Sequence, residues 1–353
     1  MSLVPLYGHD ALRARLLGSL QRGSLPQSLL LHGDAGVGKQ RLALWLASVL
    51  TCERDERPCG QCRHCRMAGD LTHPDITWVF PRPRLKDSDP SADDVKADAI
   101  EGAMERAKAH GLYAAPSGSE GIYVPTIRMV VRNASVSPAL ARRKVVVVGD
   151  AERMVAQEGS DQAANAFLKL LEEPSGNTFL VLTSSAPGSL LPTIRSRVVA
   201  VRVAPLAPAD VLRWLDDPLV LDALKKESVP AGRAERAALA AGAPGRLLGA
   251  QDSASAFEAA RRFLDVAQSG DAERATRLAM SQGAAGARGA FSDFLDAIET
   301  ELRTRMEAAV RRGDEGSARS AAHAVESLED AKTLANGNVN PQLIAWSLLT
   351  GMR

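Results

Sequence analysis

The stretch that decides the fold is Gly33-Asp34-Ala35-Gly36-Val37-Gly38-Lys39-Gln40. It has the spacing of a P-loop, in which backbone N–H groups surround phosphates and the lysine reaches the outer ones. An apolar run at 28–32 reads as a buried strand entering the loop, and 39–47 reads as a helix leaving it. This setting predicts a nucleotide-type site whose binding residues include Gly33, Gly36, Gly38 and Lys39. A glycine-rich turn with no phosphate role is the alternative.

The last position of the motif departs from the P-loop pattern. A working P-loop has Ser or Thr after the lysine, and that hydroxyl holds Mg²⁺. Here the residue is Gln40, whose amide oxygen sits on a longer and more flexible arm. We therefore expect a loop shaped for phosphates but poorly equipped for hydrolysis, and binding of ATP or ADP stays open.

A second apolar run supports this interpretation. Residues 144–149 are rich in valine and are followed by Asp150, which predicts a central parallel strand with an acid at its carboxyl end, near the phosphates. Hydrolysing proteins of this class have a second acid next, where this chain has Ala151. Glu152 is expected to point to the other side if the strand continues. Two losses in one site argue against catalysis, although the valine run alone fits any buried strand.

All four cysteines lie in one short segment, at Cys52, Cys59, Cys62 and Cys65. Four thiolates at this spacing can close a tetrahedral shell around Zn²⁺, which predicts structural zinc because no coordination position remains open for catalysis. Two disulfides, an iron–sulfur cluster, or replacement of one thiolate by His64 are alternatives.

Composition narrows the class of protein. The 353 residues are enough for two or three domains at about 150 residues each. Lys plus Arg total 43 against 42 for Asp plus Glu, so the formal net charge of +1 argues against a uniformly basic nucleic-acid binder, though not against a local patch. We see no signal peptide and no apolar run of membrane-spanning length, so we expect a cytoplasmic protein with no membrane partner.

Three later motifs indicate a more specific class of protein. They are Asn165-Ala166-Phe167-Leu168-Lys169-Leu170-Leu171-Glu172-Glu173-Pro174, the segment Ser196-Arg197-Val198, and His73-Pro74-Asp75 after the cysteines. Their order resembles the bacterial clamp-loader subunits of the AAA+ class, and most closely the delta-prime branch of the DNA polymerase III family. The resemblance covers nearly the whole chain and is weakest at 82–121 and in the last hundred residues.

The resemblance implies a role for individual residues. Arg197 matches the arginine finger, which reaches into the ATP site of a neighbouring gamma or tau subunit and stabilises charge on the transferring phosphoryl group. Thr183 matches the sensor position at the end of a core strand. A surface ion pair is the alternative for Arg197. A gamma or tau subunit would keep a hydroxyl after Lys39 and an acid at 151, so the departures favour the delta-prime type.

The resemblance also implies partners and a domain order. The partners are gamma/tau ATPase subunits and delta, with the sliding clamp and primer–template DNA reached through the complex. The fold class is an α/β AAA+ core with a parallel sheet, then a small helical lid and an all-α C-terminal collar. The expected ranges are 1–204 for the core, with a zinc knuckle at 52–65 and an insertion at about 82–121, 205–252 for the lid, and 253–353 for the collar.

Local patterns add further expectations. Strands are expected at about 28–32, 75–80, 144–149 and 178–183. Within the insertion, Ser91 is a candidate N-cap and Gly111 follows a helix whose apolar face is listed as Val95, Ala99, Ile100, Ala103, Met104 and Ala107. That helix packs on its own domain or contacts a partner. An apolar stripe of helical spacing is expected at Phe291, Phe294, Leu295, Ile298 and Leu302.

Two other functions remain in competition. The retained Lys39 and Asp150 are compatible with an active ATPase of the gamma/tau type. Arginines around the cysteines, such as Arg54 and Arg63, are compatible with direct DNA binding, although acidic residues interleave and no stacking aromatics accompany them.

Overall fold

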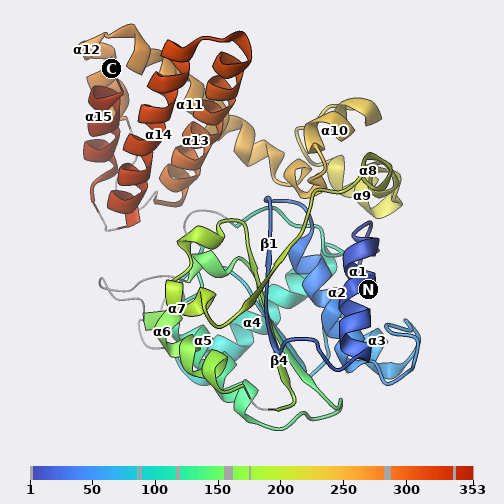
Figure 1. Ribbon diagram of the computed structural model, residues 1–353. Helices are drawn as coiled ribbons and strands as arrows, with labels where there is room; N and C mark the ends of the chain where they lie inside the picture. Colours follow the sequence, from blue (N-terminus) through green and yellow to red (C-terminus); the bar gives the residue numbers. More distant parts are fainter. Residues whose placement is uncertain are drawn as a thin grey trace. The chain divides into compact units, whose positions relative to one another are not determined.

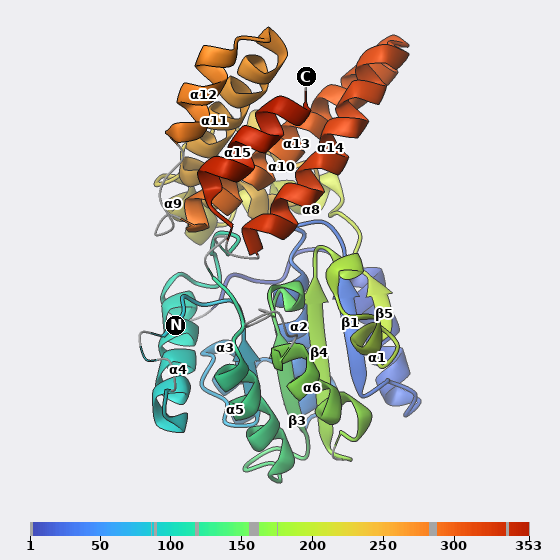
Figure 2. The same cartoon turned by 90° about the vertical axis from the view of Figure 1, so that its left-hand side faces the viewer.

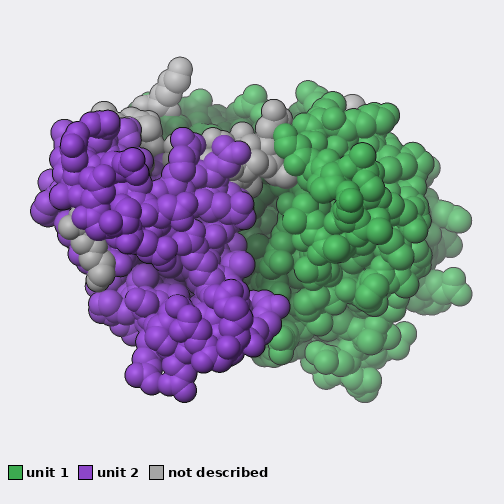
Figure 3. All heavy atoms as spheres, turned by 90° about the horizontal axis from the view of Figure 1, so that it is seen from above, with its two compact units in different colours: residues 1–115, 121–249 green, residues 116–120, 250–353 purple. Residues whose placement is uncertain are grey.

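The computed structural model describes residues 3–85, 87, 90–116, 120–154, 162–174, 176–281, 288–336 and 339–352. The chain forms two compact units, which Figure 3 colours separately. Unit 1 comprises residues 1–115 and 121–249, and unit 2 comprises 116–120 and 250–353. In the described ranges, no helix is both long and apolar enough to span a bilayer.

A five-stranded sheet lies at the centre of unit 1 (Figure 1). All strand pairs are parallel, in the order β2-β3-β4-β1-β5. The strands are β1 Ser28–His32, β2 Ile76–Val79, β3 Lys144–Val148, β4 Thr178–Ser184 and β5 Val199–Arg202. The parallel α/β core and the four expected strands are confirmed, and the edge strand β5 is an addition.

Alternate residues of the central strands pack against helices on opposite faces of the sheet. Leu29 and Leu31 face the side of α1 Asp10–Gln21 and α2 Lys39–Thr51, while Leu30 faces the side of α5, α6 and α7 (Figure 2). These helices span Val124–Ser135, Gln162–Glu172 and Pro192–Arg195. Burial on both faces explains why β3 and β4 are almost continuously apolar. Because the strands are parallel, the loops after β1, β3 and β4 meet at one edge of the sheet.

The insertion forms helix α4, Ala92–Lys108, at the β2 edge of the sheet. Ser91 caps the helix as expected, in a capping box with Asp94. Arg82 anchors the helix through ion pairs to Asp98 at 3.1 Å and Glu105 at 2.5 Å. Arg82 also forms an antiparallel bridge with Gly121 that closes the base of the insertion.

The buried face of α4 includes Val95 and Ala107, as expected, but otherwise differs from the expected one. Ile100 and Met104 are 51% and 53% exposed, whereas Gly102 and Arg106 are buried. The helix turns this way because Gly102 leaves room for the Arg82 side chain, which lies 3.1 Å from where a Cβ would be. Part of the loop that follows the helix, including Gly118, lies outside the described residues.

Short helices follow the sheet within unit 1. They are α8 Pro208–Leu215, α9 Pro218–Leu224, α10 Arg233–Ala240 and the 3₁₀ turn η3 Pro244–Leu247. Their apolar residues, among them Trp214 and Leu247, share a cluster with Val4 from the N-terminal segment. Tyr7 adds a hydrogen bond from its hydroxyl to the Asp217 carboxylate at 2.8 Å. The lid segment is therefore continuous with the packing of unit 1.

Unit 2 is helical where the structure describes it, which confirms the helical C-terminal part. Its helices are α11 Ala250–Ser269, α12 Ala272–Met280, α13 Arg288–Arg312, α14 Glu315–Asn336 and α15 Pro341–Gly351. The expected stripe on α13 is buried in this unit's core, with each member at most 5% exposed: Phe291, Phe294, Leu295, Ile298 and Leu302. Asn340 caps α15 through its side chain.

Candidate functional site

The P-loop lies at the carboxyl end of β1, and its backbone is closely packed. Gly36 has φ of 83°, which favours glycine, and a Cβ there would lie 2.8 Å from the Arg246 nitrogen. A Cβ on Gly33 would lie 2.2 Å from the carbonyl oxygen of Val203. The Gly245 N–H donates to the Gly36 carbonyl at 2.9 Å, so η3 touches the loop directly. Gly38 precedes α2 as its N-cap.

Lys39 is directed at its own loop. The side chain is buried, and its ammonium donates to the carbonyls of Gly33 and Asp34, both at 2.8 Å, and to the Ser185 hydroxyl at 3.1 Å. These bonds use all three ammonium donors. Burial lowers the pKa of Lys39, while the nearby Asp150 and Glu152 charges oppose that shift. In this arrangement no donor of Lys39 remains for a phosphate.

Gln40 has a defined structural role. Its amide nitrogen donates to Asp150 Oδ2 at 2.8 Å. Its oxygen accepts hydrogen bonds from Trp78 Nε1 at 3.1 Å and from Arg106 Nη1 at 3.0 Å. A Cβ on Gly149 would lie only 2.3 Å from this oxygen, so the glycine makes room for the amide. Gln40, which departs from the P-loop motif, is thus buried and is hydrogen-bonded to residues of β2 and α4 and to the acid that follows β3.

Arg106 reaches Gln40 from the insertion helix α4. Its guanidinium carbon lies 3.3 Å from the ring centroid of Phe80, 3.8 Å from that of Tyr113 and 4.8 Å from that of Trp78. Aromatic faces attract a guanidinium, more strongly when it is removed from water. We refer to Trp78, Phe80 and Tyr113 as the aromatic cluster, which fixes the cation beside the P-loop.

Asp150 lies at the expected place, at the end of β3. Its N–H donates to Thr183 Oγ1 at 3.0 Å, so the predicted acid and the predicted sensor threonine are brought together. Burial raises the pKa of Asp150 to about 6, and the Glu152 charge acts in the same direction. Lys39 and Arg106 oppose this shift.

We expect Asp150→Asn to stabilise the fold at pH 8. With the folded pKa raised from 3.8 to about 6, the carboxyl favours folding below pH 3.8, and that contribution is lost as the pH rises through 6. An asparagine keeps the acceptor for Gln40 without the buried charge, so the gain at pH 8 is about 1–3 kcal/mol. Urea unfolding at pH 5 and pH 8 measures it. A variant less stable than the parent at pH 8 would contradict this prediction.

Glu152 lies on the same side as the loop, against the expectation that it points away. The strand ends at Val148 and the 3₁₀ turn η1, Ala151–Arg153, follows, so the alternation of a strand does not reach this residue. Glu152 Oε1 accepts from the N–H groups of Ser185 at 2.7 Å and Ala186 at 3.3 Å. It therefore fixes the loop after β4.

The four cysteines form a compact cluster. Their sulfurs all lie within 4.8 Å of one another, with 3.9 Å between Cys52 and Cys62 and 3.9 Å between Cys59 and Cys65. Four sulfurs at about 2.3 Å from a tetrahedral Zn²⁺ lie about 3.8 Å apart, so the residues fit that ion. A disulfide needs about 2.05 Å, and the four are free cysteines. The cluster can hold a metal ion.

The elements around the cluster explain its geometry. Cys52 follows α2, and Cys62 is the N-cap of α3, Arg63–Gly69, which carries Cys65. The Cys62 N–H donates to Cys59 Sγ at 3.3 Å, and the Cys65 N–H donates to Cys62 Sγ at 3.5 Å. Such N–H groups favour thiolates, the form that binds metal.

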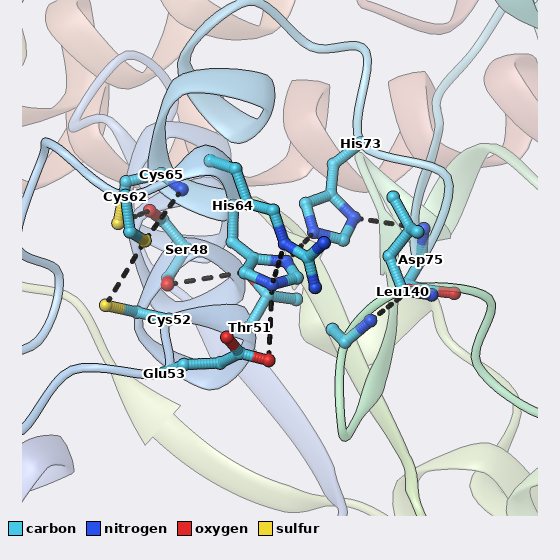
Figure 4. Close-up of polar contacts among 12 residues, drawn as sticks. Ser48, Thr51, Cys52, Glu53, Cys62, His64, Cys65, His73, Asp75 and Leu140 are labelled. Carbon is cyan, nitrogen blue, oxygen red and sulfur yellow. Dashed lines mark hydrogen bonds and ion pairs between the residues drawn. The ribbon is translucent and has the colours of Figure 1, made fainter.

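His64 turns away from the sulfurs into a separate buried chain of contacts (Figure 4). Its Nδ1 lies 2.8 Å from His73 Nε2, and His73 Nδ1 accepts the Asp75 N–H at 3.0 Å. The Asp75 carboxylate accepts three backbone N–H groups from residues 139–141, at 2.5, 2.7 and 2.7 Å. Burial acts to raise the pKa of Asp75, but these three bonds hold it below its usual value. The chain of contacts joins the cysteine segment to the sheet.

Arg197 lies just after α7, in an ion pair within the chain. Its Nη2 donates to Glu172 Oε1 at 2.6 Å, and its Nη1 donates to the Thr193 carbonyl at 2.9 Å. About a third of the side chain is exposed. Among the hydrogen bonds found in the described residues, none joins Arg197 to the chain's own P-loop.

Sequence reasoning missed several residues of the P-loop region, namely Trp78, Phe80, Arg106, Tyr113 and Ser185. A signal for Arg106 was present. It follows Val95 by eleven residues, about three helical turns, and so shares its buried face. A pattern of apolar residues does not reveal it, because this buried residue is a cation.

Comparisons with known proteins agree on a family. A family model described as "DNA polymerase III, delta subunit" matches residues 8–207. The DNA polymerase III subunit delta' of Pseudomonas aeruginosa is 34% identical over 58% of this chain and 51% of that protein. The DNA polymerase III subunit tau of Salmonella typhimurium is 26% identical over 54% of this chain and 23% of that protein.

A solved structure, a gamma subunit-related protein from Thermotoga maritima, is 18% identical and covers 96% of this chain and 100% of that one, with a TM-score of 0.35. The chain spans about half the length of the delta' relatives it matches.

Proposed function

Because the chain belongs to the DNA polymerase III delta-prime family of clamp-loader subunits, we propose that it is a clamp-loader subunit that does not itself hydrolyse ATP. It helps to load the sliding clamp during DNA replication. It supplies Arg197 as an arginine finger to the ATP site of a neighbouring subunit. Membership of the family supports a role in the clamp-loader complex. The residues around the P-loop support the absence of hydrolysis by this chain, and the setting of Arg197 supports its action on a neighbouring subunit.

The contact between Gln40 and Asp150 is the observation that carries the non-hydrolysing role. In a hydrolysing P-loop protein the hydroxyl after the lysine and the acid after the strand both hold Mg²⁺. Here the two positions bind each other at 2.8 Å. Ala151, where a water-activating acid would stand, is fully buried and has no proton acceptor on its side chain.

The setting of Arg197 suits a residue that acts on a neighbour. Its partner Glu172 is about half exposed, and an ion pair at the surface is worth about 0–1 kcal/mol. Redirecting the guanidinium to another subunit's γ-phosphate therefore costs little. A positive charge placed there stabilises the charge that develops on the transferring group.

The partners follow from this role. They are gamma/tau ATPase subunits and delta, with the sliding clamp and primer–template DNA contacted through the complex, in the cytoplasm. Residues 1–204 act as the AAA+ core, 205–252 as its lid and 253–353 as an oligomerisation collar. Exposed apolar residues on α14 and α15, including Leu334 and Trp346, support a contact surface there. Zinc in the four-cysteine cluster has a structural role.

The test of the finger is the DNA-stimulated ATPase of the assembled complex. An arginine finger is worth roughly 10³-fold at the site it serves, so Arg197→Ala should lower the rate of the whole complex severalfold while assembly is unchanged. Arg195→Ala, which removes an exposed arginine of the same turn, is the matched control and should have no such effect. An unchanged rate in a fully assembled Arg197→Ala complex would reject the role.

One observation favours a second candidate, an active ATPase of the gamma/tau type. The chain retains Lys39 and Asp150 and is similar to a tau subunit. ATP turnover by the purified chain that disappears in Lys39→Ala would support this alternative. The non-hydrolysing role requires no turnover in either protein.

A further inference from the structure

The insertion helix α4 contributes a buried cation to the P-loop region, where nothing in the motif calls for one. We propose that Arg106 acts as a built-in substitute for the divalent metal and closes this chain's nucleotide site in a state that needs no ligand. This goes beyond the role in the complex, because it concerns the chain's own site and does not depend on Arg197.

The position of Arg106 fits this task. Its Nη1 donates to Gln40 Oε1 at 3.0 Å, and the same amide donates to Asp150 Oδ2 at 2.8 Å. The Gln40 amide thus lies between the guanidinium and the carboxylate and is hydrogen-bonded to both. A working site places a metal ion between the residue after the lysine and the acid, and here Gln40 and Arg106 complete that connection within the protein.

The charges of the region are balanced without a ligand. Arg106 and Lys39 supply two positive charges, and Asp150 and Glu152 supply two negative charges. Arg106 and Lys39 both act on Asp150, and Glu152 acts on Asp150 and on Lys39. A divalent cation would add two positive charges to this neutral group, which already contains two cations.

Burial makes the arrangement hard to displace. The three rings of the aromatic cluster hold the guanidinium within 5 Å of their centroids. A buried charge that loses its partners costs several kcal/mol, so moving Arg106 aside is unfavourable. Binding of Mg-nucleotide would also have to break the contact between Gln40 and Asp150 and the three bonds of Lys39.

Restoring the missing hydroxyl alone should therefore not restore the site. Gln40→Thr removes the acceptor of Trp78 Nε1 and the Gln40 contact of Arg106, while the guanidinium keeps its place within the aromatic cluster. The double variant Gln40→Thr/Arg106→Leu supplies the hydroxyl and removes the cation. If Gln40 alone prevented the binding of Mg-nucleotide, Gln40→Thr would bind it as tightly as the double variant does.

The experiment is a titration of the full-length variants with fluorescent ADP, with and without Mg²⁺. We expect the double variant to bind at least about tenfold more tightly than the parent and than Gln40→Thr, only with Mg²⁺, and to lose binding when Lys39→Ala is added. Gln40→Thr/Lys108→Ala is the matched control, because Lys108 is an exposed cation two residues along the same helix. It should bind no better than Gln40→Thr.

A charge-retaining variant covers the case in which leucine at 106 prevents folding. Gln40→Thr/Arg106→Lys keeps a cation on α4, and we expect it to stay closed to Mg-nucleotide. Mg²⁺-dependent binding by this variant, by Gln40→Thr alone or by the parent protein would overturn the proposal, as would a folded double variant that does not bind. None of these results bears on Arg197, whose test is the ATPase of the complex.

Discussion

Replacing Cys62 by Ser is expected to remove the metal from the chain and to loosen the segment from Cys52 to Cys65. Cys62 has two roles, as a member of the sulfur cluster and as the N-cap of α3. Structural zinc contributes about 10–16 kcal/mol to folding in isolated zinc-finger peptides, and a segment attached to a stable sheet should lose a part of that. The thermal midpoint should fall, and a protease should cut within 53–64.

Metal content and limited proteolysis measure this effect. The parent chain should carry one zinc and Cys62→Ser almost none, and a strong chelator should reproduce the protease sensitivity in the parent. Ser48→Ala is the control, because Ser48 contacts Cys65 Sγ at 3.8 Å but is not a ligand. A parent protein purified without stoichiometric metal, and indifferent to the chelator, would show that the four cysteines serve another purpose.

Asp75→Ala should be the most damaging substitution among the buried acids of the sheet. It removes the acceptor of three backbone N–H groups from the loop at 139–141. Hydrogen bonds to a charged group are worth about 1.5–3 kcal/mol each, and a buried donor left without a partner adds to the loss. We expect a fall of about 4 kcal/mol in the free energy of unfolding at pH 7, measured in urea, and a smaller fall for Asp75→Asn.

The loss at Asp75 should depend on pH in a defined direction. The folded pKa lies below the usual 3.8, so the carboxylate's contribution is complete above pH 3.8 and is lost as the pH falls through the folded pKa. The difference between the parent and Asp75→Ala should therefore shrink in acid. A difference that stays constant down to pH 2.5 would mean that the charge of Asp75 is not what holds the loop.

Elements with a local pattern could be predicted from the sequence. The run at 144–149 alternates between two buried faces, and the stripe from Phe291 to Leu302 repeats at helical spacing, so each carries its own evidence. The spacing of the cysteines is similarly local. The edge strand β5 was not predicted, because at four residues with mostly exposed side chains it has little apolar pattern.

The interior of the P-loop region could not be predicted in the same way. Gln40 bonds to Trp78, 38 residues away, and to Arg106, 66 residues away. Such contacts depend on how the insertion helix lies against β2, and no spacing in the sequence encodes that. The motif indicates that Gln40 is a poor replacement for a hydroxyl, and the structure shows which contacts its amide makes.

The contact between Gly36 and Gly245 depends on the absence of a side chain at both positions. The lid segment meets the loop through main-chain atoms, with the Gly245 N–H bonded to the Gly36 carbonyl. An added Cβ at either residue would lie 2.8 Å from backbone atoms of the other segment. The close approach of the two segments at this point thus requires glycine at both positions. Sequence changes elsewhere in 205–249 can therefore leave the contact between η3 and the loop in place, whereas a side chain added at either glycine cannot.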